Sequence, residues 1–137
     1  MKLRTYLNYG GNCKEAFAFY EKDLGGKIGM MMTFAQQPDA AKTPPELKDK
    51  ILHAQITIGE TVLMASDVPA DRFQPMRSVY LALNVDSDQE AERIYALLTE
   101  NGEVFMPMQE TFFATRFAQC RDRFGTSWMI LHERPMP

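Results

Sequence analysis

The first half of the chain changes its hydrophobic period from two to about four and back again. Residues 3–9 read as a strand. A turn follows at residues 10–11, and Asn12 with Glu15 three positions later marks the start of a helix. Its apolar side chains share one face: Ala16, Phe17, Tyr20 and Leu24. After a glycine pair, the strand pattern returns in three segments, at residues 27–34, 51–58 and 61–66. The order predicts a βαβββ unit with a polar loop over residues 35–50.

The second half repeats this order of patterns. Residues 78–85 alternate between two sets of side chains, which predicts a strand. A helix follows, started by residues 86–88 and ended by residues 101–102. Its buried face is predicted to hold Ala91, Ile94, Tyr95 and Leu98. Three more strands are predicted at residues 103–108, 115–121 and 127–132. In the turn between the last two, Gly125 suits the positive φ of a tight hairpin.

The repeat predicts an α+β fold of two βαβββ modules, with a period of about 70 residues. Residues 1–68 form the first module, residues 69–77 a linker and residues 78–137 the second module. A four-stranded sheet with one helix hides only one of its faces, so we expect the modules to form a curved mixed sheet around a common trough. A single ferredoxin-like βαββαβ sheet is the competing architecture, but it leaves several predicted strands unplaced.

Composition and charge exclude several classes of protein. The 137 residues are 45% hydrophobic and 24% charged, as in ordinary globular proteins. A net charge of −3 and the absence of basic runs argue against a nucleic-acid partner. No apolar segment has the length of a secretory signal or a membrane span, so we expect a cytoplasmic protein without a membrane partner. Cys13 and Cys120 lack metal-site or disulfide spacing and are expected to be reduced thiols.

Several segments resemble a known superfamily. Residues 15–25 resemble the first helix of the vicinal-oxygen-chelate (glyoxalase/bleomycin-resistance) proteins, with its Phe-Tyr and Leu-Gly pairs. Residues 108–114 and 122–130 resemble the PhnB-like (YjdN-like) branch of that superfamily. The likeness also includes residues 11–13, 53–54 and 63–67. It covers nearly the whole chain and implies the two-module fold and a homodimer.

Some members of this branch carry the label 3-demethylubiquinone methyltransferase-like. The residues here do not support methyl transfer, because no glycine-rich strand-to-helix loop within a βαβ unit is present to hold S-adenosylmethionine. The pair Gly10 and Gly11 is too weak a signal by itself. We therefore expect no cofactor.

Superfamily enzymes such as glyoxalase I hold a divalent metal through His and Glu residues on the first and last strands of each module. Aligned by this resemblance, the four ligand positions fall on Thr5, Met64, Tyr80 and Met129. Hydroxyl, phenol and thioether groups do not replace the imidazole and carboxylate ligands of such metals. The resemblance therefore implies a member without the usual metal site.

We expect a ligand pocket built from strands of both modules. Its candidate residues are Thr5, Tyr6, His53, Met64, Tyr80, Glu110, Phe112, Arg116, Trp128 and Met129. In the superfamily register Thr5 and Tyr80 face the trough, whereas Tyr6 and Trp128 have the opposite parity on their strands. Aromatic and thioether groups would give apolar contact, and the acidic, basic and imidazole side chains would orient the ligand.

Some of these residues also fit ordinary structural roles. His53 shares a polar strand face with Gln55 and Thr57, which suits a ligand contact or a hydrogen-bonded surface position. Residues 109–113 suit either a ligand contact or an interface. His132 is expected at the surface without a role. Several methionines offer either adaptable pocket surface or ordinary core, at residues 30–32, 106 and 108.

Two further residues keep alternative explanations. Arg116 complements an anionic ligand, or it is a strand residue paired with Glu110 or Asp122. Cys13 lies in the first turn of a helix, where the macrodipole favours a reactive thiolate, but a small buried side chain is the competing explanation.

Three functions fit this sequence. The first is a metal-independent protein that binds a small, partly aromatic molecule in the trough. The second is a metal-dependent lyase, isomerase or dioxygenase of the superfamily, with Glu110 or His53 as general base. The third is a structural homodimer whose cavity is filled by its own side chains. Fold-level likeness does not choose among them.

Overall fold

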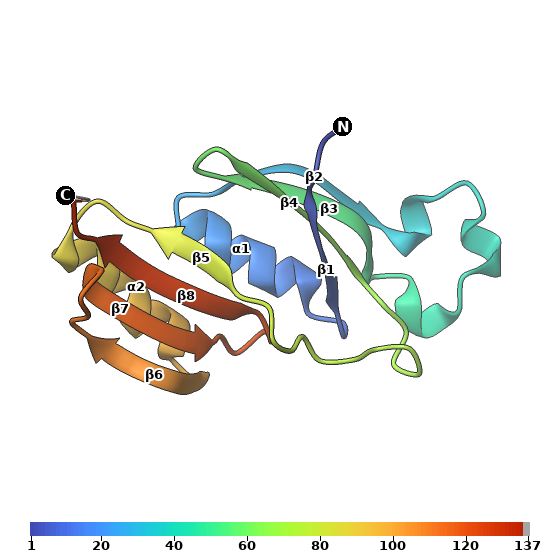
Figure 1. Cartoon of the computed structure of the whole chain (residues 1–137). Coiled ribbons are helices and arrows are strands. Elements are labelled where there is room, and N and C mark those ends of the chain that lie inside the picture. The colour runs from blue at the N-terminus through green and yellow to red at the C-terminus, as the bar shows by residue number, and fades with distance from the viewer. Residues whose placement is uncertain (136–137) are drawn as a thin grey trace. The chain divides into compact units, whose positions relative to one another are not determined.

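The computed structural model describes residues 1–135 and divides the chain into two compact units, Met1–Gln74 and Pro75–Pro137 (Figure 1). We call these the first and the second unit and describe each by itself. The boundary lies within residues 69–77, the segment expected to link two modules. No helix among residues 1–135 is long and apolar enough to cross a membrane.

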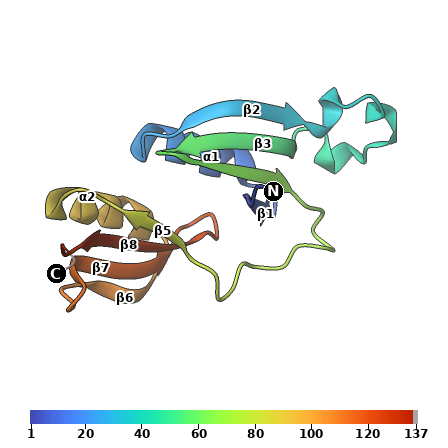
Figure 2. The same ribbon diagram turned by 45° about the horizontal axis from the view of Figure 1, so that its top comes forward.

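In the first unit the elements are β1 (Thr5–Tyr9), α1 (Cys13–Asp23), β2 (Lys27–Thr33), β3 (Ile51–Ile58) and β4 (Thr61–Asp67). The sheet has the strand order β1-β4-β3-β2, with β1 parallel to β4 and the other pairs antiparallel. Figure 2 shows α1 against one face of this sheet. The loop between β2 and β3 contains three 3₁₀ turns, η1 (Phe34–Gln36), η2 (Ala40–Lys42) and η3 (Pro45–Leu47).

The second unit has the same topology. Its elements are β5 (Leu81–Asn84), α2 (Asp88–Thr99), β6 (Glu103–Gln109), β7 (Ala114–Arg121) and β8 (Ser127–Glu133). The strand order β5-β8-β7-β6 matches that of the first sheet, again with the first strand parallel to the last. The predicted α+β fold of two βαβββ modules is confirmed, and the single ferredoxin-like sheet is excluded.

In each unit, the apolar side of the helix packs on apolar residues that alternate along the strands, and the residues of both elements are buried. In the first unit these residues are at most 7% exposed: Leu7, Tyr9, Ala16, Phe17, Tyr20, Ala54, Ile56, Leu63 and Ala65. In the second unit they are at most 5% exposed: Ala91, Ile94, Leu98, Ala118, Cys120, Trp128 and Ile130. Because successive strand side chains point to opposite faces, each sheet presents a second set of residues on its other face.

A carboxylate from the last strand of the first unit holds the N-terminus of α1. Oδ1 of the buried Asp67 accepts hydrogen bonds from the backbone N–H groups of Gly11 and Cys13, each at 3.0 Å. Its Oδ2 accepts a hydrogen bond from the N–H of Ile51 at 2.8 Å. Asn12, the expected N-cap, makes no side-chain capping bond. The helix begins directly after Asn12, as predicted, but its first N–H group, that of Cys13, binds Asp67 from β4.

The second unit begins differently. Ser87 caps α2 locally, since its side chain accepts a hydrogen bond from the N–H of Glu90 at 3.0 Å. The strand β5 begins at Leu81, where pairing with β8 begins, and Ser78 is not extended because its φ is 58°. The strand predicted over residues 78–85 was therefore too long.

The hairpin between β7 and β8 is built around a second buried carboxylate. Asp122 accepts hydrogen bonds from the N–H groups of Phe124 and Thr126, each at 3.0 Å, and from the indole N–H of Trp128 at 2.8 Å. Gly125 has the positive φ that its place in the predicted turn suggested, at 100°. Each unit therefore contains a buried carboxylate that ties a turn or a helix end to a strand.

Candidate ligand-binding face

The face of the first sheet that turns away from α1 carries two rows of four side chains, none of which is buried, beside a further row with Val62, Thr57 and Lys27. We call it the helix-free face of the first sheet, and one of its rows runs across all four strands as Tyr6, Met64, Gln55 and Met30. The next row holds Asn8, Ser66, His53 and Met32. Neighbours within such rows have their side chains in contact range.

A chain of polar contacts crosses this face. The imidazole of His53 lies between Tyr6 and Gln55, with its Nδ1 3.3 Å from Tyr6 Oη and its Nε2 3.2 Å from Gln55 Nε2. The Tyr6 and His53 rings stack with centroids 5.8 Å apart and planes 28° from parallel. Because the Gln55 amide nitrogen donates to Nε2, the neutral imidazole carries its hydrogen on Nδ1 and donates to Tyr6 Oη. The phenolic hydrogen of Tyr6 then points to other acceptors.

The chemistry of the face follows from its residue types. Three thioethers, from Met30, Met32 and Met64, surround the polar chain and give it a polarisable apolar border. Tyr6 is 47% exposed, so its hydroxyl is accessible. A surface with a few connected hydrogen-bonding groups among apolar side chains is the usual composition of a small-molecule site.

The corresponding face of the second sheet begins with a similar row and then diverges. The similar row is Ala82, Met129, Gln119 and Met106. The next row holds Asn84, Leu131, Phe117 and Gln109. Phe117 and Leu131 are only 6% and 7% exposed, and they form one apolar cluster with Ala114, Met106 and Met129. The ring of Phe113 packs on Phe117 with centroids 5.1 Å apart.

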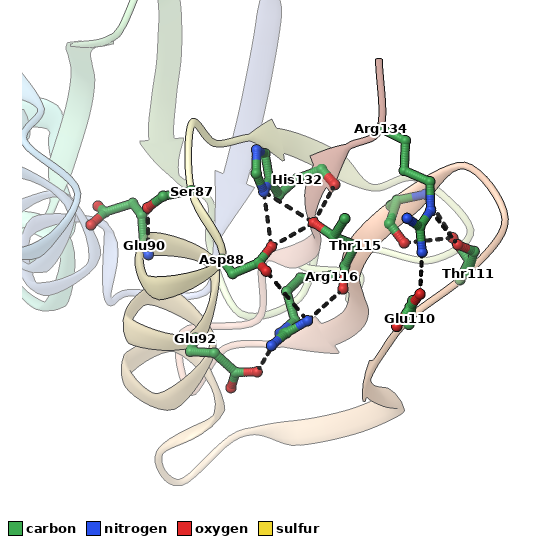
Figure 3. Close-up of polar contacts among 11 residues, drawn as sticks. Ser87, Asp88, Glu90, Glu92, Glu110, Thr111, Thr115, Arg116, His132 and Arg134 are labelled. Atoms are coloured by element: carbon green, nitrogen blue, oxygen red, sulfur yellow. Dashed lines mark hydrogen bonds and ion pairs between the residues drawn. The ribbon is translucent and has the colours of Figure 1, made fainter. Parts of the chain in front are cut away.

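A separate polar cluster lies at the start of α2, where three elements of the second unit meet (Figure 3). Asp88 Oδ1 accepts hydrogen bonds from Thr115 Oγ1 at 2.5 Å and from His132 Nδ1 at 2.9 Å. These hydrogen bonds, first from His132 and then from Thr115, hold the pKa of Asp88 below its ordinary value. The hydroxyl binds the carboxylate and Nδ1 rather than Nε2, so this is not the relay of a nucleophilic triad.

The two cysteines are buried and unreactive in character. Burial raises the pKa of the Cys13 thiol to about 12, with further contributions from Asp67 and Glu15. Burial and Asp122 likewise raise the pKa of Cys120 to about 12. The helix macrodipole therefore does not produce a thiolate at Cys13, and the buried side chain is the correct explanation.

Of the predicted pocket residues in the first unit, three lie together. Tyr6, His53 and Met64 share the helix-free face. Thr5 does not, because it pairs with Leu63 on the side of α1. The expected parity was therefore reversed: Tyr6 is beside Met64, and Thr5 points to the other face. A register difference of one residue is sufficient to exchange the two faces.

The predicted residues of the second unit are more dispersed. Met129 belongs to the apolar cluster, and Tyr80 lies outside β5, where its ring meets Phe105 edge-on at 6.3 Å. Trp128 is 1% exposed and points to the helix side, as its parity suggested. Phe112 is 92% exposed at the turn between β6 and β7.

The two charged candidates of the second unit have other partners than expected. Arg116 forms ion pairs with Asp88 at 3.5 Å and Glu92 at 3.1 Å (Figure 3). Glu110 pairs with Arg134. The suggested pairing of Arg116 with Glu110 or Asp122 was wrong, because Arg116 extends to the side of α2 while Glu110 lies in the turn after β6.

Of the four positions that the resemblance aligned with metal ligands, Met64 and Met129 lie on the helix-free sheet faces, whereas Thr5 pairs with Leu63 on the helix side and Tyr80 precedes β5. In the observed pairing, Tyr6 of β1 lies beside Met64 of β4, and Ala82 of β5 lies beside Met129 of β8. None of these four offers an imidazole or a carboxylate. Among residues 1–135, no group of three or more His, Cys, Asp or Glu residues is placed to hold a metal ion.

The glycine pair before α1 does not form a cofactor-binding loop either. The N–H groups of Gly11 and Cys13, which a nucleotide phosphate would need, already bind Asp67. Lys50 Nζ donates a hydrogen bond to Gly11 O at 3.0 Å and ties the same turn to the start of β3.

Sequence reasoning missed two groups of residues. Gln55 was noted only as a neighbour of His53 on a polar strand face, which was the signal for its role. Thr115 and His132 come from different strands, and no spacing in the sequence connects them with Asp88.

Comparison with known proteins agrees with this topology. The sequence model of the family described as 3-demethylubiquinone-9 3-methyltransferase matches residues 1–131. Protein YjdN of Escherichia coli (strain K12) is 31% identical over 138 residues, covering 95% of this chain and 94% of YjdN.

Two solved structures have the same fold along nearly the whole chain. Protein PA1353 from Pseudomonas aeruginosa is 40% identical with a TM-score of 0.88, covering 98% of this chain and 99% of that one. The PhnB protein from Bacillus cereus is 21% identical with a TM-score of 0.83, covering 96% and 99%. The chain therefore belongs to the family whose description is 3-demethylubiquinone-9 3-methyltransferase, and it is similar to protein YjdN along nearly its whole length.

Proposed function

We propose that this protein binds a small molecule on the helix-free face of its first sheet and does so without the superfamily's divalent metal. The observation that carries the proposal is the connected chain of Tyr6, His53 and Gln55. These groups are linked in advance and border three thioethers, so a ligand gains oriented hydrogen bonds together with apolar contact. The matching face of the second sheet, closed around Phe117, offers no such group.

Backbone amide NMR with the neutral probe N-phenyl-1-naphthylamine tests this location. We expect the largest chemical-shift changes at Tyr6, His53 and Met64, and a weaker affinity in His53→Ala. Phe112→Ser is the control, because Phe112 is 92% exposed in the second unit and its loss leaves the proposed site intact. Shift changes confined to the second unit, or equal affinity in His53→Ala and the parent protein, would contradict the proposal.

We also propose that the protein assembles as a homodimer. The support in the second unit is the edge strand β6, whose Val104 and Phe105 are 46% and 42% exposed. Exposed apolar edge strands favour association. Sedimentation equilibrium should give twice the chain mass, whereas a monomer at high micromolar concentration would refute the dimer.

A further inference from the structure

We propose that the ligand of the helix-free face of the first sheet is an uncharged carbonyl compound with an aromatic or conjugated body. This inference rests on the proposed function and specifies its ligand. Three properties of the face point to this class: the absence of acidic and basic side chains from the two rows around the polar chain, the direction of its hydrogen bonds and its thioether border.

The two rows that contain the polar chain hold no lysine, arginine or carboxylate side chain. Their eight residues are tyrosine, asparagine, serine, glutamine, histidine and three methionines. The cations nearest in register are Lys27, which pairs with Thr57 one row away, and Arg4, which precedes β1. Both are exposed, so water solvates and screens them. A charged ligand would lose hydration on this face without gaining a close counter-ion.

The hydrogen-bond chain presents a donor to the ligand. The Gln55 amide nitrogen lies 3.2 Å from His53 Nε2, and with that amide as the donor His53 donates from Nδ1 to Tyr6 Oη. The oxygen of Tyr6 is thereby an acceptor within the protein, and its own hydrogen remains to donate outward. The natural complement is a carbonyl oxygen, which accepts hydrogen bonds and carries no charge.

The border of the face determines the body of the ligand. Met30 and Met64 flank Gln55 in one row, and Met32 lies opposite His53 in the next. Thioethers are polarisable and pack well on aromatic surfaces, and their flexible chains adapt to flat ligands of different outline. A planar conjugated body therefore suits the face better than a branched sugar or a phosphate ester.

The second sheet provides an internal control for this argument. It repeats the Met-Gln-Met order with Met129, Gln119 and Met106. Phe117 occupies the place of His53 in the matching row, so Gln119 has no imidazole to orient there. We therefore expect one binding site per chain, located in the first unit.

Three probes with one aromatic body separate the contributions. They are 2-acetylnaphthalene, which has a carbonyl acceptor, 2-naphthoate, which has a charged carboxylate, and 2-ethylnaphthalene, which has neither. Titration of the full chain at pH 7, followed by NMR, should give the tightest binding for 2-acetylnaphthalene. Its advantage over 2-ethylnaphthalene should be about fivefold, as one additional hydrogen bond gives.

Matched variants test whether the tighter binding of 2-acetylnaphthalene depends on the chain of polar contacts. In Tyr6→Phe, the affinity for 2-acetylnaphthalene should fall to that for 2-ethylnaphthalene, while 2-ethylnaphthalene binds as before. Gln55→Leu should also reduce the advantage, because His53 loses the amide that sets its tautomer. Gln119→Leu, the same substitution at the matching position of the second sheet, should change neither affinity.

The outcomes distinguish the two levels of the proposal. Tighter binding of 2-naphthoate, equal binding of all three probes, or an unchanged preference in Tyr6→Phe would overturn the ligand class while leaving a small-molecule site in place. If none of the probes shifts amides of the first sheet, both the ligand class and the proposed function are wrong.

Discussion

The two units have the same topology and differ most in one row of their sheets. In the first unit this row is Asn8, Ser66, His53 and Met32, and in the second it is Asn84, Leu131, Phe117 and Gln109. The replacement of a serine and a histidine by Leu131 and Phe117 changes an accessible polar face into a closed apolar cluster. The topology is unchanged, because the residues that pack on the helix specify it and this row faces the other way.

A second difference concerns how each helix is started. The N-terminus of α1 depends on Asp67, which reaches it from β4, whereas α2 is capped by the adjacent Ser87. Formation of α1 is therefore coupled to the completed sheet, while α2 carries its own start signal. The same topology thus allows the first N–H groups of the helix to bind either a side chain from a distant strand or the side chain of the adjacent N-cap residue.

The largest expected effect tests the hydrogen bonds that Asp67 of β4 accepts at the start of α1. Asp67→Ala leaves three N–H groups without their acceptor, two of them in buried hydrogen bonds, so the free energy of unfolding should fall by about 4 kcal/mol. Urea denaturation followed by circular dichroism measures it. Glu60→Ala, at the exposed turn before β4, is the control and should be nearly neutral. A loss below about 1 kcal/mol would mean that α1 does not depend on β4 in this way.

The difference between the two faces predicts unequal effects at matching positions. Phe117→Ala removes a ring from a closed cluster and should destabilise the protein by about 3 kcal/mol. His53→Ala removes a partly exposed side chain and should cost less than about 1 kcal/mol. Thermal unfolding of both variants measures the two losses of stability. Equal losses would show that the first sheet's face is closed as tightly as the second.

The thiols report the opening of each unit separately. With a pKa of about 12, Cys13 and Cys120 hold about a thousandfold less thiolate than a thiol with a pKa of 9. At pH 8 a disulfide reagent should react about a thousandfold more slowly in the native protein than in urea, in proportion to the thiolate population. Cys13→Ala and Cys120→Ala each leave one reporter. Fast reaction of either native thiol would show that its unit opens locally.

These same thiols give a stability change with pH. Their pKa values are raised in the folded state, so burial of the neutral thiols contributes stability that is complete below about pH 9. That contribution declines as the pH rises from 9 towards 12, where the unfolded chain ionises first. The thiol part of the decline is the difference between the parent protein and Cys120→Ala in urea titrations at pH 8 and pH 10.

The smallest expected effect tests the capping of α2 by the adjacent Ser87. Ser87→Ala removes one capping acceptor, so the free energy of unfolding should fall by about 1 kcal/mol. Ser87→Asp restores an acceptor and should return most of the stability, as measured by urea denaturation. A loss as large as that of Asp67→Ala would remove the distinction between a local and a long-range helix start.

Much of the fold was predictable from the sequence. The changes between period two and period four located both helices and nearly all strands, and the repeated order gave the two-module fold. These signals are local, because side chains within one element must meet the same face. Boundaries were less certain, as at Ser78, whose positive φ is not extended, and β5 begins only at Leu81.

The candidate site depended on tertiary structure. Tyr6 and His53 are 47 residues apart and meet only because β1 and β3 both flank β4. The sequence placed Thr5 toward the site, whereas the register placed Tyr6 there. Hydrophobic alternation identifies two faces of a strand, but a one-residue difference in pairing exchanges them. Periodicity therefore determined which elements form, and strand pairing decided which side chains share a site.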